Sequence, residues 1–122
     1  MGETSLTGYG VRRLVRDRYL VWRTERNRDT AMRYLDGLAA ALERRGWRCV
    51  QTYRPVVVAV RVPLLRVYGA DVAVTLRVLA MPGGGWGFHE ARQGRDGFLC
   101  RCGDDVEPAA RMIDRFLRDR PM

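Results

Sequence analysis

Hydrophobic positions from residue 11 to residue 45 recur at the spacing of an amphipathic helix, three and four residues apart. A polar run at 24–30 divides this stretch. The pattern therefore predicts either one long helix or two helices, with Asn27 or Asp29 as a cap. Gly46 ends the pattern, because glycine suits the left-handed conformation that follows many helices. The apolar positions are Val11, Leu14, Val15, Tyr19 and Trp22, and then Ala31, Leu35, Leu38, Ala39 and Leu42.

After Gly46 the hydrophobic period falls to two, which is typical of strands. Turn residues follow at 82–85 and 94–97. We expect Trp86, Phe88, Phe98 and Cys100 to lie in the core, with Cys102 on the face of Phe98 and Cys100, and His89 turned away from Trp86 and Phe88. The predicted strands cover 47–54, 56–62, 71–80, 86–90 and 98–102, and 64–69 is either a short further strand or a continuation of 56–62.

The last periodic segment is a helix. Asp104 and Glu107 stand at the spacing of a capping box, and Pro108 falls in the first turn, where its missing N–H is tolerated. An apolar stripe then recurs at helical spacing over Val106, Ala109, Ala110, Ile113, Phe116 and Leu117.

Helices, then strands, then a helix predict an α+β fold. We expect an N-terminal helical region, a mainly antiparallel meander of four to five strands, and a C-terminal helix packed on the sheet. Residues 1–10 are interpreted as a flexible tail and 11–120 as a single domain. No apolar run approaches the ~20 residues of a membrane span, and no secretory signal is apparent. A cytoplasmic protein with three reduced cysteines is therefore expected.

Charge is unevenly distributed along the chain. The net charge is +8, and all 22 basic residues are arginine. Residues 1–61 carry 13 arginines and 6 acidic residues, whereas residues 62–122 carry 9 arginines and 8 acidic residues. An anionic partner is therefore expected to meet the N-terminal half of the chain.

Residues 82–102 contain the residue types that most resemble a phosphate-binding loop, a zinc site or a catalytic thiol. The glycine cluster at 83–87 precedes a strand pattern, so it lacks the helix N-terminus that a phosphate loop requires. Cys100 and Cys102 are spaced poorly for zinc, and a metal set would need His89 and Cys49 as well. Thiol catalysis requires a thiolate with a neighbouring base. We interpret the thiols as packing residues and expect no catalytic residue, metal, cofactor or small-molecule substrate.

Several segments together resemble small uncharacterised proteins of actinobacteria. They are LERRGW at 42–47, PLLRVYG at 63–69, PGGGWGF at 82–88 and CGDDVEPAARMI at 102–113. The likeness spans roughly residues 31–117. Such proteins are often encoded beside helix-turn-helix regulators, so the resemblance implies an accessory role in regulation and brings no catalytic residues.

The N-terminal helix carries the main functional hypothesis, which is a non-enzymatic, cytosolic protein-interaction module with itself or a regulator as partner. The alternatives are a nucleic-acid-binding protein that uses the same helix and, least favoured, a small enzyme or metal-binding protein. A membrane role is not expected. A purely structural alternative is that the apolar side of this helix packs on the sheet. The candidate contact residues are Arg12, Arg16, Tyr19, Trp22 and Arg23.

Overall fold

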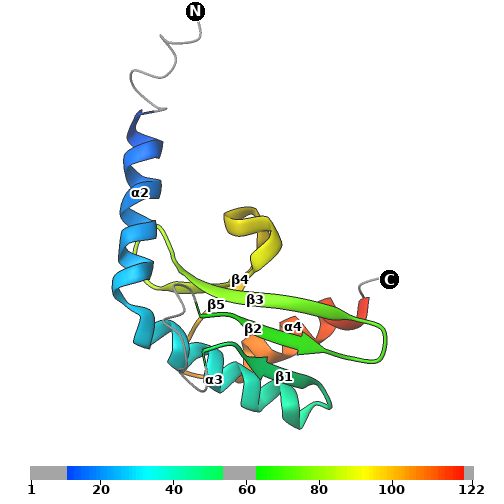
Figure 1. The fold of residues 1–122 in the computed structure, drawn as a ribbon. Coiled ribbons are helices and arrows are strands. Elements are labelled where there is room, and N and C mark those ends of the chain that lie inside the picture. The colour runs from blue at the N-terminus through cyan, green and yellow to red at the C-terminus, as the bar shows by residue number, and fades with distance from the viewer. Residues whose placement is uncertain (1–10, 54–62, 120–122) are drawn as a thin grey trace, which may run out of the picture.

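The protein has an α+β fold, as predicted (Figure 1). A computed structural model describes residues 11–53 and 63–119, with side chains from Val15 onward in the first range. The predicted tail at 1–10 and the predicted strand at 56–62 lie outside the described residues. The elements are α2 (Val11–Arg26), α3 (Arg28–Arg44), β1 (Arg48–Gln51), β2 (Leu65–Tyr68), β3 (Ala73–Ala80), β4 (Trp86–Glu90), the 3-10 helix η2 (Ala91–Gly97), β5 (Phe98–Arg101) and α4 (Glu107–Asp119).

The N-terminal helical stretch consists of two helices that meet at Asn27. The Asn27 side-chain amide donates to the carbonyl oxygen of Arg23 at 2.8 Å, which closes the last turn of α2. The Asn27 side chain therefore hydrogen-bonds a carbonyl group in the last turn of α2 and makes no side-chain capping bond to α3. At the other end of α3, Gly46 has a φ of 97°, and its N–H donates to the Glu43 carbonyl oxygen. The predicted helix end is confirmed.

The five strands form an antiparallel meander in the order β1-β2-β3-β4-β5. The alternation predicted for 71–80 is confirmed, since Val74, Leu76, Val78 and Ala80 are all buried. Gly83, Gly84 and Gly85 have positive φ in the turn between β3 and β4. These conformations explain why the turn is made of glycine.

Helices α3 and α4 lie on one side of the sheet, whereas α2 and η2 stand on the other side (Figure 1). We call these the helix-covered face and the open face. The helix-covered face holds the core, in which side chains from α3 and α4 pack on the strands. Among the described residues, its fully buried large aliphatic side chains are Leu35, Leu38, Leu42, Leu65, Val67, Leu76, Ile113 and Leu117.

The prediction that Phe98 lies in the core beside Cys100 is wrong. A register shift between Phe88 and His89 pairs Phe88 with Cys100 and His89 with Phe98. Leu99 is the extra residue on β5 at this shift, and it turns Phe98 to the open face. The Phe98 side chain is 44% exposed there, and its ring centre lies 5.4 Å from that of His89. Cys100 is buried on the helix-covered face, as predicted.

The predicted cap of α4 also needs correction. Asp105, not Asp104, accepts from the Glu107 N–H at 3.0 Å, and α4 begins at Glu107 itself. The Glu107 side chain pairs with Arg44 rather than returning to a cap. Before β5, the turn predicted at 94–97 begins at a kink within η2, where Gly94 has a φ of 58° and a ψ of −130°.

Candidate functional site

Helix α2 is attached to the sheet through Leu20 and Thr24, its two buried side chains among those described. The Thr24 hydroxyl accepts from the Ala80 N–H at 2.9 Å and donates to the Leu20 carbonyl oxygen at 2.8 Å. Strand β2 pairs with β3 only from Ala73 to Leu76, so Ala80 lies beyond the start of β2. Arg95 donates to the Ala80 carbonyl oxygen at 2.9 Å. Two side chains thus satisfy the backbone groups of Ala80.

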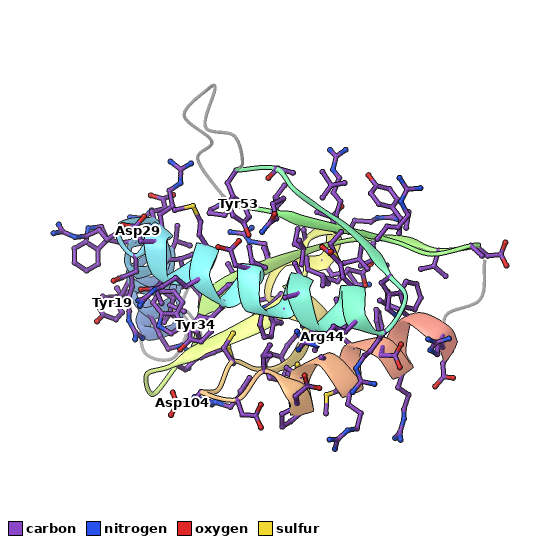
Figure 2. The ribbon with its side chains drawn as sticks, turned by 90° about the horizontal axis from the view of Figure 1, so that it is seen from below. Tyr19, Asp29, Tyr34, Arg44, Tyr53 and Asp104 are labelled. Carbon is purple, nitrogen blue, oxygen red and sulfur yellow. The ribbon has the colours of Figure 1, made fainter. Side chains whose placement is uncertain are left out.

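This attachment leaves the described part of the apolar stripe of α2 facing solvent. At 100° per residue, Val15, Tyr19 and Trp22 lie on the side of the helix roughly opposite Leu20 and Thr24. Their side chains are 62%, 54% and 52% exposed, respectively. Figure 2 shows Tyr19 on the side of the helix away from the sheet. We call these three residues the outer face of α2.

The outer face is organised by ring contacts. The rings of Tyr19 and Trp22 lie 5.9 Å apart with an interplanar angle of 32°. The Arg26 guanidinium carbon sits 5.1 Å from the centre of the Trp22 ring, at the distance of a cation–π contact. A shallow hollow of about 400 Å³ borders Trp22 and is lined by Asp17, Arg18, Val21, Trp22 and Glu25. The surface therefore offers aromatic rings, a neighbouring depression and charged groups of both signs.

The structure separates the candidate contact residues. Arg16, Tyr19 and Trp22 are exposed. Arg23 turns toward the sheet instead and lies over Trp86, with 5.0 Å from its guanidinium carbon to the ring centre. The Arg12 side chain lies outside the described residues. The candidate residues therefore do not form one exposed surface, because Arg23 packs against Trp86 of β4.

The thiols are held in their protonated form. Burial raises the pKa of Cys49 and Cys100 to about 11 and that of Cys102 to about 12. A thiol with such a pKa is a poor nucleophile at neutral pH. In the part of the chain that the structure describes, no three metal-ligating side chains come together.

His89 is buried on the open-face side of β4, away from Trp86 and Phe88, as predicted. Its Nδ1–H donates to the Gly87 carbonyl oxygen at 3.0 Å. Burial lowers the pKa of His89, so the imidazole is neutral at pH 7. Its ring packs against Phe98, which gives it a structural environment rather than a cleft.

A cavity of about 570 Å³ lies between α3 and the loop that leads into α4. Tyr34, Arg44 and Asp104 border it (Figure 2). The Arg44 guanidinium pairs with Glu107 at 2.9 Å, so charges of both signs line the space and partly neutralise each other. Sequence reasoning did not find this cavity, because its walls are about 60 residues apart in the chain. Its lining offers polar contacts without an activated nucleophile.

Comparison of the chain with protein-family models, curated proteins and solved structures finds no match. Within residues 11–53 and 63–119, no helix has both the length and the apolar character needed to cross a membrane. Among the described residues, seven large apolar side chains are exposed, and Val15, Tyr19 and Trp22 of the outer face are three of them.

Proposed function

We propose that the protein is a non-enzymatic protein-interaction module that binds its partner on the outer face of α2. The observation that carries this proposal is the exposure of Val15, Tyr19 and Trp22 on one helix side. Contiguous exposed apolar patches commonly mark interaction sites. Tyr, Trp and Arg, which make up and border this surface, are also the residues that contribute most to binding energy at interfaces.

Charge defines the chemistry of the partner. Helix α2 contains six arginines but only Asp17 and Glu25 as acidic residues. A second copy would bring two arginine-rich helices together, and like charges facing each other across an interface are unfavourable. We therefore favour an acidic amphipathic helix of a different protein, whose apolar side covers Tyr19 and Trp22 while its carboxylates meet Arg16, Arg18 and Arg26.

A transcriptional regulator is the first partner to test. This part of the proposal rests on the resemblance of residues 31–117 to actinobacterial proteins encoded beside helix-turn-helix regulators. The alternative of nucleic acid bound along Arg12, Arg16 and Arg23 requires a continuous basic row. Its support is weakened by Arg23, which packs over Trp86.

The proposal is tested by affinity capture with three forms of the protein. Wild type is compared with Tyr19→Ala/Trp22→Ala and with Met112→Ala, whose side chain is 53% exposed on α4. We expect one stoichiometric protein with wild type and with the Met112 control, and its loss with the outer-face variant. Binding of the purified pair, measured by isothermal titration calorimetry, should weaken at least about ten-fold in the outer-face variant, as for an interface hot spot.

Two outcomes contradict the proposal. One is a partner that binds the outer-face variant as tightly as wild type. The other is self-association of wild type that the outer-face variant abolishes, measured by sedimentation equilibrium, because this would assign the surface to a second copy. Circular dichroism melts of all three proteins establish that the variants are folded.

A further inference from the structure

The open face of the sheet concentrates the positive charge of the strands. The strands contain four arginines, Arg48, Arg66, Arg77 and Arg101. Cross-strand pairing places them opposite Tyr68, Val50, His89 and Gly87, respectively, all on the open face. Within the five strands as the structure describes them, the only acidic residue is Glu90, which pairs with the buried Leu76 and so belongs to the helix-covered face.

Aromatic rings lie among these arginines. Tyr68 is directly opposite Arg48 in the β1–β2 pair. Phe98 is directly opposite His89, which is itself opposite Arg77. Neighbouring strands lie about 4.8 Å apart, and alternate residues of a strand about 6.8 Å apart. The open face therefore presents guanidinium groups and rings as near neighbours, and 44% of the Phe98 side chain is exposed.

Positive charge is poorly compensated where β3 meets β4 and η2. Burial and the charge of Arg95 lower the pKa of Arg77, and both arginines contribute to lowering the pKa of His89. Among the described residues, no hydrogen bond reaches the buried Nε of Arg77. Asp17 on α2 is the acidic group that acts on Arg95. An anion bound here would relieve the repulsion between the cations.

We propose that the open face binds single-stranded nucleic acid, with phosphates on Arg48, Arg66 and Arg77 and bases stacked on Tyr68 and Phe98. Positive side chains that follow a backbone, interleaved with aromatic rings, are the shared chemistry of single-strand binding surfaces. A duplex keeps its bases stacked on one another, so it has no free base faces for these rings. An acidic peptide matches the charge but lacks planar bases.

This inference is independent of the proposed function. It uses residues of β1, β2, β3 and β5, whereas the proposed protein partner uses the outer face of α2. In Figure 1, α3 and α4 lie on the other side of the sheet, and the helices on the open side, α2 and η2, contact mainly β3 and β4. Arg48 and Arg66 are accordingly exposed, whereas Arg77 is half-buried.

The test is fluorescence anisotropy of a labelled oligothymidylate of about 12 nucleotides, a length suited to one small binding surface. At about 50 mM salt we expect saturable binding, with log K falling linearly against log salt by about 0.7 for each phosphate contacted. Arg48→Ala/Arg66→Ala should reduce that slope by about 1.4 and weaken binding about ten-fold or more. The matched control is Arg111→Ala/Arg115→Ala on α4, where both side chains are exposed; it should stay near wild type.

Stacking is tested separately from charge. Tyr68→Ala and Phe98→Ala should each weaken binding about five-fold or more, whereas Tyr68→Phe, which keeps the ring, should bind like wild type. The proposal is overturned by absence of binding at low salt, or by equal weakening in the α4 control pair. It is also overturned if a blunt duplex or a polyglutamate peptide binds as tightly as the single strand. Thermal melts verify the fold of each variant.

Discussion

At the scale of single residues, one hydroxyl determines which side of α2 meets the sheet. Thr24 stands in the polar run that divides the helical pattern, so its sequence context indicates a loop or an exposed turn. It instead lies 7% exposed against β3, because the Ala80 N–H has no strand partner there. The two residues are 56 positions apart. Local pattern could not connect them, since the unmet hydrogen bond exists only once the sheet has formed.

Replacing Thr24 with Val should therefore destabilise the protein by about 1–3 kcal/mol, the typical cost of leaving a buried donor unsatisfied. Valine matches threonine in shape, so the change isolates the hydroxyl. Thr24→Ser, which retains the acceptor, serves as the control and should lose less. The measurement is urea unfolding monitored by circular dichroism. A Thr24→Val protein within about 0.5 kcal/mol of wild type would show that the bond to Ala80 contributes little.

At the scale of elements, periodicity predicted which residues form each helix better than it predicted which side of the helix is buried. The stripe of α4 and the stripe of α2 have the same spacing, yet Ile113 and Leu117 are fully buried whereas Tyr19 and Trp22 are half exposed. The helix end at Gly46, the meander and most strand bounds followed from local residue types. The face of α2 and the side of Phe98 did not, because they depend on a strand end and on a register shift.

Helix α4 is fixed through Asp114, and this contact should give stability a pH dependence. The Trp47 Nε1–H and the Arg118 Nε–H both donate to Asp114 Oδ1 at 2.8 Å. These hydrogen bonds, with the charges of Arg118 and Arg45, hold the pKa of Asp114 below its ordinary value. Because the folded pKa is depressed, the stabilisation is present above about pH 4, the pKa of an unperturbed Asp. It is lost as pH falls through the lowered pKa.

Asp114→Asn should accordingly be less stable than wild type at pH 7 by about 1 kcal/mol or more, since asparagine keeps an acceptor but loses the charge. The deficit should shrink as pH falls below about 3, where the wild-type carboxyl also becomes neutral. Urea unfolding at the two pH values measures it, with Asp119→Asn on the exposed end of α4 as control. A deficit of equal size at both pH values would indicate a steric cause.

At the scale of the whole molecule, charge sorted by sheet face is more informative than charge counted along the chain. Counting by halves predicted that an anionic partner meets residues 1–61. The open face draws Arg48 from that half, and Arg66, Arg77 and Arg101 from the other. Each occupies the polar side of an alternating strand, which the sequence shows. Bringing them onto one surface requires the register of all five strands, which it does not show.

The outer face of α2 and the open face should act independently, because they lie on different elements and share no residue. Tyr19→Ala/Trp22→Ala should leave oligothymidylate affinity within about two-fold of wild type. The protein that carries all four substitutions should bind oligothymidylate as weakly as Arg48→Ala/Arg66→Ala does by itself. Changes at sites without shared partners add within about 0.5 kcal/mol. Partner capture should show the converse, with loss in the outer-face pair and retention in the arginine pair. A larger coupling in the anisotropy titrations would mean that α2 and the sheet hold one continuous ligand.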